Sequence, residues 1–207
     1  MQRIIFATGN VGKMREIKMI LADLLIDGET VEVLSMKEAG IEADIVEDGI
    51  TFSENAAIKA KAVAAMAPDA IVMADDSGLE VDYLNKEPGI YSARYLGEDT
   101  PYSEKNANII GRLSGVPVEE RSARFVCAIA AALPGGELLE SLETIEGYIG
   151  YEERGERGFG YDPIFMVPSY QKSTAELTEE EKNEISHRGK ALRSMKVQLQ
   201  EYYSNAE

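Results

Sequence analysis

The feature that most constrains this fold is an apolar run that ends at two adjacent carboxylates. Residues 70–74 read Ala-Ile-Val-Met-Ala, and Asp-Asp-Ser-Gly follows at 75–78. The run has the length and composition of a buried strand. We predict that this strand stops at the two aspartates, that Gly78 lets the backbone turn, and that a second extended segment begins at Leu79.

The two aspartates at the end of this run also predict a metal site. Neighbouring carboxylates repel each other unless a cation or a shared proton relieves the repulsion, and this favours a hard metal ion. The alternative is an acidic, solvated turn at the end of a strand.

The rest of the chain alternates between strand and helix patterns, which is typical of an α/β fold. Runs of apolar residues predict strands, while Ser/Thr capping positions and apolar residues at helical spacing predict helices. The predicted strands are 4–7, 31–34, 70–74, 122–133 and 138–149, and predicted helices follow residues 13, 51, 100, 178 and 190. The turn at 134–137 predicts a hairpin, so we expect a mixed sheet with a second lobe built on long strands. We assign one domain, residues 1–207.

The composition argues against two classes of binding partner and indicates where the protein is located. The 207 residues include 21 basic and 37 acidic side chains, a formal charge of −16, which argues against binding to nucleic acid or to an anionic membrane. The single cysteine, Cys127, lies in an apolar run and is expected to be a buried, inert thiol. We find no apolar run of membrane-spanning length and no signal-peptide core, so we expect a cytoplasmic protein.

A glycine-bearing loop between the first strand and the first helix is a candidate phosphate site. Backbone N–H groups and a helix N-terminus at such a loop can hold a phosphate, and a lysine adds a point charge. The loop departs from the P-loop pattern at Ala7 and Met14, and a plain strand-to-helix turn is the alternative. Its residues are Thr8, Gly9, Asn10, Val11, Gly12 and Lys13.

Glu47 lies just ahead of a helix whose start is marked by a capping box of Thr51 and Glu54. From there its carboxylate could reach a cation shared with the aspartates, although a solvated loop is the simpler interpretation. Asn55 and Lys59 lie on one face of the same helix, and Lys59 either points at this pocket or is exposed.

An aromatic, glycine-rich segment at 157–165 is a candidate for binding a planar base. Phe159 stands between two glycines and could present its ring face, while Asp162 offers hydrogen bonds. The alternative is a simple aromatic turn. Lys182, His187 and Arg188 form a basic set in an acidic protein, as an anionic ligand requires, although a lone histidine is more often structural.

Five motifs in this order resemble the inosine triphosphate pyrophosphatase family. The resemblance runs from Ile4 to the final helix, and the set is specific although each motif alone is weak. The motifs are Thr-Gly-Asn-Val-Gly-Lys at 8–13, Thr-Phe-Ser-Glu-Asn-Ala at 51–56, Ala-Asp-Asp-Ser-Gly-Leu at 74–79, Phe-Gly-Tyr-Asp-Pro-Ile-Phe at 159–165 and Ser-His-Arg-Gly at 186–189.

The resemblance implies a fold and a reaction. The fold is an elongated, two-lobed α/β structure around a long mixed sheet flanked by helices, with the active-site cleft between the lobes. The enzyme would be a nucleoside triphosphate pyrophosphohydrolase that converts non-standard purine nucleotides (ITP, dITP and XTP) to the monophosphate and pyrophosphate, cleansing the nucleotide pool. It would act as a homodimer with Mg²⁺.

The resemblance also implies roles for individual residues. Asp76 would be the catalytic base and a metal ligand, and Glu47 a second metal ligand. The triphosphate would be bound by the loop Thr8, Gly9, Asn10, Val11, Gly12 and Lys13, together with Ser77 and Lys182. The base would be recognised by Phe159, Gly160, Tyr161, Asp162, His187 and Arg188.

Two other functions remain open from the sequence. One is a nucleoside triphosphate pyrophosphatase of different base preference, because stacking on Phe159 tolerates any base. The other is a nucleotide-binding sensor without turnover. The carboxylates at 75–76 and Glu47 argue against a sensor, because a pure binder has no need to gather carboxylates beside a triphosphate.

Overall fold

A computed structural model of the chain describes residues 2–205, which divide into two compact units. Unit 1 comprises Met1–Asp76, Cys127–Glu143 and Arg188–Glu207, and unit 2 comprises Ser77–Val126 and Thr144–His187. Each unit has its own buried apolar cluster. The chain therefore crosses from one unit to the other within its longest strands and at the start of its last helix.

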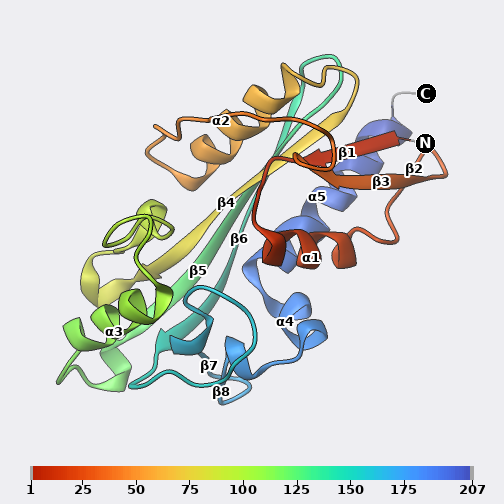
Figure 1. The fold of residues 1–207 in the computed structure, drawn as a ribbon. Coiled ribbons are helices and arrows are strands. Elements are labelled where there is room, and N and C mark those ends of the chain that lie inside the picture. The colour runs from red at the N-terminus through yellow and green to blue at the C-terminus, as the bar shows by residue number, and fades with distance from the viewer. Residues whose placement is uncertain (1, 206–207) are drawn as a thin grey trace. The chain divides into compact units, whose positions relative to one another are not determined.

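Residues 2–205 form five α-helices and one eight-stranded sheet (Figure 1). The helices are α1 (Val11–Ile20), α2 (Phe52–Ala64), α3 (Tyr102–Arg112), α4 (Glu179–Ile185) and α5 (His187–Ser204). The strands are β1 (Gln2–Phe6), β2 (Leu25–Ile26), β3 (Glu29–Ser35), β4 (Ile71–Val81), β5 (Ser122–Ala132), β6 (Leu138–Ile149), β7 (Phe165–Val167) and β8 (Lys172–Ser173).

The sheet order is β2-β3-β1-β4-β5-β6-β7-β8, and the pairing is mixed. Strand β1 pairs in parallel with β3 and β4, whereas β2–β3, β6–β7 and β7–β8 are antiparallel. The mixed α/β sheet and the 134–137 hairpin predicted from the sequence are therefore confirmed. The predicted elongated shape and the cleft between lobes remain predictions.

The core of unit 1 lies where α1 and α5 cover one face of its strands (Figure 1). The predicted apolar stripe after residue 13 is buried, and so are the corresponding positions of the terminal helix. The buried side chains are Met14, Ile17, Leu21, Leu24, Leu192, Met195 and Leu199. Their burial packs α1 and α5 against the strands of unit 1.

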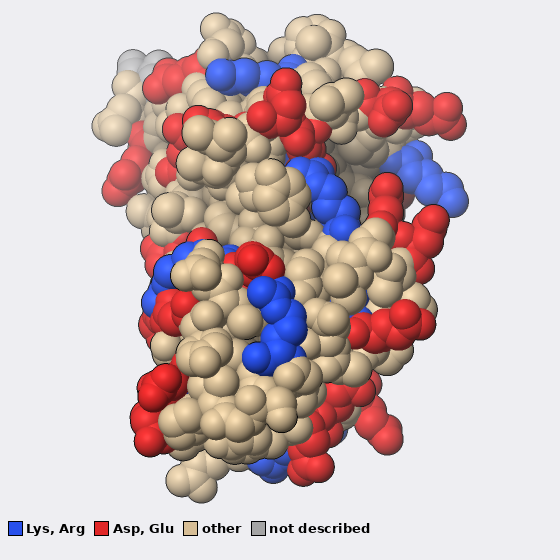
Figure 2. All heavy atoms as spheres, turned by 90° about the vertical axis from the view of Figure 1, so that its left-hand side faces the viewer, with Lys and Arg blue, Asp and Glu red and all other residues tan. Residues whose placement is uncertain are grey.

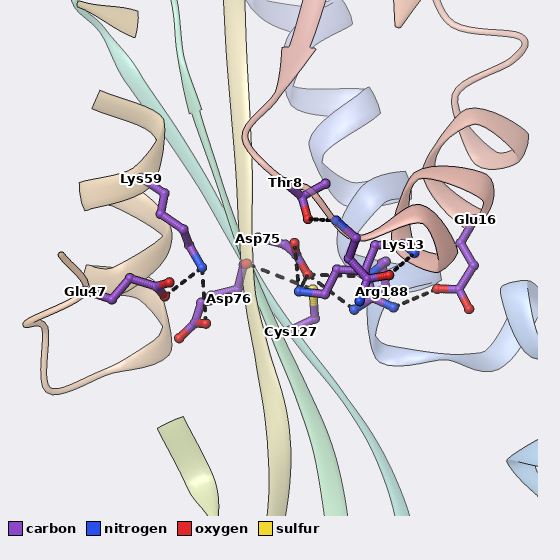
Figure 3. Close-up of polar contacts among 11 residues, drawn as sticks. Thr8, Lys13, Glu16, Glu47, Lys59, Asp75, Asp76, Cys127 and Arg188 are labelled. Atoms are coloured by element: carbon purple, nitrogen blue, oxygen red, sulfur yellow. Dashed lines mark hydrogen bonds and ion pairs between the residues drawn. The ribbon is translucent and has the colours of Figure 1, made fainter. Parts of the chain in front are cut away.

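Helix α2 lies across β4 from α1 and α5 (Figure 3). Its N-terminus is closed by the predicted capping box, in which the Thr51 side chain accepts from the Glu54 N–H and Glu54 accepts from the Thr51 N–H. The buried residues of α2 include the small side chains of Ala56 and Ala60, which allow the helix to pack closely against its neighbours.

Strand β4 corrects the prediction that the chain turns at the aspartates. It runs unbroken from Ile71 to Val81, through both carboxylates and Gly78. Carboxylates and glycine are rare inside strands, and this rarity is what suggested a stop. The strand continues because both aspartates have buried cationic or amide partners and because Leu79 and Val81 enter the core of unit 2.

Unit 2 is built on the last part of β4, the first part of β5 and the last part of β6, with β7, β8, α3 and α4. The predicted helix at 100–113 is α3, but the residue that precedes it is Pro101 and makes no side-chain cap. Thr100, the predicted cap, instead donates to the Leu96 carbonyl at 2.7 Å.

Acidic and basic side chains are mixed on the face that Figure 2 shows. Figure 2 shows Asp and Glu side chains distributed across one face, interspersed with Lys and Arg, with no continuous basic patch on that face. Among residues 2–205, no helix combines the length and apolar character required to cross a membrane.

The packing of β6 against β7 predicts a sharp effect of one glycine. A Cβ at Gly147 would overlap the Met166 carbonyl oxygen and lie 2.7 Å from the Phe165 ring. We expect Gly147→Ala to lower the free energy of unfolding by about 1–3 kcal/mol. Gly111→Ala is the matched control, because a Cβ there meets nothing within 4 Å and helix α3 should gain up to about 1 kcal/mol. Urea denaturation would measure both, and equal stabilities would contradict this packing.

Candidate active site

Asp75 and Asp76 point to opposite faces of β4 (Figure 3). This follows from the strand geometry, because successive side chains in a strand alternate between faces. Asp75 faces α1 and α5, and Asp76 faces α2. The expectation of two side-by-side carboxylates that share one cation is therefore wrong, and each aspartate has its own partners.

Asp75 is 1% exposed and is held by two cations. Lys13 Nζ lies 3.0 Å from Asp75 Oδ2, and Arg188 Nη2 lies 3.2 Å from the same oxygen. Arg188 also pairs with Glu16 at 2.6 Å. Burial alone would favour the neutral acid, but Lys13, Arg188 and Lys59 hold the pKa of Asp75 well below its usual range. The carboxylate is therefore ionised and joins α1, β4 and α5.

The partners of Arg188 differ from those suggested by sequence. The resemblance assigned Arg188 to base recognition, whereas in the structure its guanidinium contacts Asp75 and Glu16, all within unit 1. Its base contact remains a prediction, and its observed contacts are those of an anchor for the start of α5.

Asp76 lies in a second charged cluster. Its Oδ1 is 3.3 Å from Lys59 Nζ, its Oδ2 accepts from the Asn55 amide at 3.3 Å, and Lys59 also bonds Glu47 at 2.8 Å. Burial raises the pKa of Asp76, and the neighbouring charge of Glu47 adds to the rise, while Lys59 opposes it. A carboxylate with a raised pKa is suited to accept a proton near neutral pH.

The structure adds Asn55 and Lys59 to the candidate site around Asp76. Asn55 is 1% exposed, and its Oδ1 accepts the Gly49 N–H at 2.9 Å, which fixes the loop that carries Glu47. Burial disfavours the charged form of Lys59, but Asp76 and Asp75 outweigh this effect and raise its pKa. The signal in the sequence was their spacing of four residues on the same helix as the Thr51 cap.

The loop at 8–13 forms the N-terminus of α1. The Asn10 side chain caps the helix by accepting the Lys13 N–H at 3.0 Å, and Thr8 accepts the Asn10 N–H at 3.2 Å. The next amides, of Val11 and Gly12, belong to the first turn, where helix geometry provides no internal acceptor. A cavity of about 390 Å³ adjoins this loop, lined by Thr8, Gly9, Met36, Lys37, Gly40, Ile41, Glu42 and Ala43.

The donors present suit a magnesium ion that is completed by substrate. The carboxylates of Glu47 and Asp76 both contact the Lys59 ammonium, so they lie on either side of a position that suits a cation. Among residues 2–205 no group of three or more His, Cys, Asp or Glu side chains is arranged to hold a metal. Mg²⁺ commonly binds through one or two carboxylates plus substrate phosphates, so two protein ligands are enough.

A third cluster lies within unit 2 around the Asp162 carboxylate. Asp162 accepts from the Phe159 N–H at 2.8 Å, from Thr174 Oγ1 at 2.8 Å and from Lys182 Nζ at 2.7 Å. The Lys182 ammonium also lies 4.8 Å from the centre of the Phe159 ring. Lys182 is bonded to the loop that carries Phe159, and its predicted contact with the triphosphate remains a prediction.

The other predicted base-site residues belong to unit 2 as well, except for Arg188. His187 stacks on Phe125, with ring centroids 4.9 Å apart. Tyr161 is buried, and its hydroxyl donates to the Ser92 carbonyl at 2.7 Å, so it anchors its loop. Ser77, the residue after Asp76, opens unit 2 within β4.

The sequence also matches a known family. The model of the Ham1 family matches residues 4–198. The chain belongs to the Ham1 family. This confirms the resemblance that the five motifs carried, because the relatives below are named as pyrophosphatases of the same kind.

Two curated relatives illustrate the similarity. A dITP/XTP pyrophosphatase of Clostridium perfringens is 47% identical over 96% of this chain and 98% of that protein. A dITP/XTP pyrophosphatase of Bacillus subtilis is 46% identical over 97% of this chain and 98% of that protein. The solved structure of a HAM1 protein from Coxiella burnetii has 39% identity and a TM-score of 0.85, with 97% of this chain and 100% of that chain covered.

The charges around Asp76 predict how its pKa responds to substitution. In the metal-free protein we expect its pKa to lie above the ordinary value of 3.8. Glu47→Gln should lower this pKa because it removes a neighbouring negative charge, and Lys59→Met should raise it because it removes a positive one. A ¹³C NMR titration of the carboxyl groups with chelator present measures all three proteins. Shifts of the same sign in both variants would contradict this arrangement.

The Asp75 cluster predicts a large effect on stability. Asp75→Asn leaves Lys13 and Arg188 without their shared carboxylate, and breaking a buried pair in this way typically costs about 3–5 kcal/mol. Because the pKa of Asp75 is depressed, its contribution is present at neutral pH and is lost as the pH falls below its ordinary range. Asp23→Asn, which removes an exposed partner of Lys196, is the control and should have a far smaller effect in urea denaturation.

Proposed function

We propose that this chain hydrolyses non-standard purine nucleoside triphosphates (ITP, dITP and XTP) to the monophosphate and pyrophosphate, and so removes these nucleotides from the cellular pool. The observation that carries the proposal is the buried Asp76 carboxylate, whose pKa is raised and which lies between Lys59 and the Asn55 amide. Membership of the Ham1 family and the names of the relatives support the same activity.

The charges of unit 1 explain why a divalent cation would be required. Three cations (Lys13, Lys59 and Arg188) face four carboxylates (Glu16, Glu47, Asp75 and Asp76). The Asp75 and Asp76 clusters taken together are therefore slightly negative before a triphosphate adds about four more charges. We propose Mg²⁺ held by Glu47 and Asp76, where it would offset this charge and polarise the phosphate oxygens.

The chain's own residues would bind the triphosphate through the N-terminus of α1. The amides of its first turn and the helix dipole favour anionic phosphate. Lys13 belongs to this turn, and its bond to Asp75 holds its ammonium in place. We also retain Ser77, next to Asp76, as a contact for the triphosphate.

Asp76 would then act as the general base. It takes a proton from water as the water oxygen attacks the α-phosphorus, and the bond from the α-phosphorus to the bridging oxygen breaks to release pyrophosphate. Lys59 lies 3.3 Å from Asp76, so it can stabilise negative charge that develops beside the base. Asn55 keeps the Asp76 carboxylate oriented throughout.

The base would be bound in unit 2. The Phe159 ring offers a stacking face, and the ammonium of Lys182, close to that ring, is neutralised by Asp162. A donor from His187 or Arg188 would favour the 6-oxo group of hypoxanthine and xanthine over the 6-amino group of adenine. A buried mismatch of that kind costs about 1–3 kcal/mol. A homodimer and a cytoplasmic location remain predictions from the resemblance and the sequence.

The decisive experiment incubates the purified chain with Mg²⁺ and separately with ITP, XTP, GTP and ATP. We expect pyrophosphate, without orthophosphate, from ITP and XTP, and little release from GTP or ATP. Equal rates on ITP and ATP would instead favour a pyrophosphatase of other base preference. Nucleotide binding without any release would favour the sensor.

A second experiment tests the bond that breaks and the role of Asp76. With ¹⁸O-labelled water, mass spectrometry should find the label in inosine monophosphate and none in pyrophosphate. Asp76→Asn should lower kcat by a factor of about 10²–10⁴, because it removes the proton acceptor. Asp69→Asn, an exposed aspartate in the same unit, is the control. A label in pyrophosphate would show attack at another phosphorus and would overturn the mechanism.

A further inference from the structure

Helix α3 presents a buried amide to the loop that carries Phe159. Asn106 is 1% exposed and lies on the inner face of α3 beside Lys105 and Ile109. A buried side-chain amide is costly unless it makes hydrogen bonds, so its partners indicate what it does. None of the motifs in the sequence points to this residue.

The amide nitrogen of Asn106 is shared between two acceptors. Asn106 Nδ2 donates to Glu153 Oε1 at 2.7 Å and to the Gly160 carbonyl at 3.3 Å. Both partners are acceptors, so the amide can lie only one way round, because a flipped amide would set its oxygen against a carboxylate and a carbonyl. All three residues belong to unit 2.

Gly160 is the position in this loop where such a bond matters most. Its φ is +67°, a conformation that glycine adopts freely and other residues rarely do. A glycine alone leaves the orientation of its peptide weakly determined, and the bond from Asn106 selects one orientation. Phe159 precedes this glycine directly, so the backbone conformation at Gly160 sets how the peptide that carries Phe159 is oriented relative to the peptide whose carbonyl Asn106 binds.

Other contacts hold the two sides of the loop. The Asp162 carboxylate binds the Phe159 N–H, and the Tyr161 ring packs edge-on against Tyr102 of α3 at 5.2 Å between centroids. A Cβ on Gly160 would lie 3.6 Å from the Tyr102 ring. Among residues 2–205, Asn106 is the only side chain that donates a hydrogen bond to the Gly160 carbonyl.

We propose that Asn106 is a positioning residue for base selectivity, which acts by fixing the Gly160 carbonyl and hence the loop backbone that presents Phe159. This inference rests on the proposed function of the same chain. The partners of Asn106, Glu153 and Gly160, are not among the residues proposed to bind the triphosphate, so Asn106 acts through the loop. Stacking on Phe159 tolerates any base, whereas hydrogen bonds to the base edge depend on how the loop orients the base. Loss of Asn106 should therefore reduce discrimination more than it reduces chemistry.

The first test is Asn106→Asp, which keeps the side-chain shape and removes the donor. We expect the ratio of kcat/KM for ITP over ATP to fall about tenfold, with the loss in KM for ITP and with kcat nearly unchanged. Asn108→Asp is the matched control on the same helix, because Asn108 only accepts from the Tyr95 hydroxyl and a carboxylate accepts equally well. An unchanged ratio in Asn106→Asp would overturn the proposal.

A double variant separates positioning of the loop from a structural link to Glu153. Asn106→Asp combined with Glu153→Gln exchanges donor and acceptor, which restores the bond between these two side chains but leaves the Gly160 carbonyl without its donor. We expect selectivity to stay impaired. Recovery of wild-type selectivity would show that the link to Glu153 is what matters and would overturn the proposal.

Hydrogen–deuterium exchange gives a readout that does not depend on turnover. In Asn106→Ala, amides of residues 158–162 should exchange faster than in wild type and in Asn108→Ala. Unchanged exchange would overturn the positioning role even if the wild-type chain fails to hydrolyse ITP. Such a failure in the wild type would count against the proposed function, so the two results are distinguishable.

Discussion

The buried charge pairing at Asp75 is the interaction on which unit 1 depends. A carboxylate at 1% exposure in the middle of a strand would be strongly unfavourable alone, and Lys13 and Arg188 make it tolerable. The same contacts fix the starts of α1 and α5, which come from opposite ends of the chain. Asp76 is the neighbouring residue on β4, so the arrangement that stabilises the strand also determines where the candidate base lies.

Much of the fold follows from local patterns that the sequence displays directly. The apolar stripe of α1, the capping box at Thr51 and the hairpin at 134–137 depend on neighbours within a few residues, and all three are confirmed. The continuity of β4 does not follow, because carboxylates and glycine usually interrupt strands. Partners from distant helices, together with the burial of Leu79 and Val81 in the core of unit 2, make the unbroken strand favourable.

The candidate site, like the fold, could be predicted from the sequence only in part. Glu47 and Asp76 lie beside the same ammonium, that of Lys59, whose spacing on α2 had marked it as a candidate. The metal ion that the sequence predicted for the two carboxylates remains a prediction. The partner of Arg188 could not be found, because Asp75 is 113 positions away and a basic residue near a histidine gives no sign of it. Asn106 carried no signal either, since its role depends on a backbone carbonyl 54 positions along the chain.

The alternation along β4 has a consequence for how this chain can change. Both residues are aspartates, and their different roles follow from the face of β4 to which each position points. Insertion or deletion of a single residue between Ile71 and Asp75 would turn the strand over, so that the candidate base met the anchoring cations and the anchor met Lys59. Point substitutions leave each aspartate on its own face. An insertion or deletion before Asp75 in β4 does so only if it involves an even number of residues.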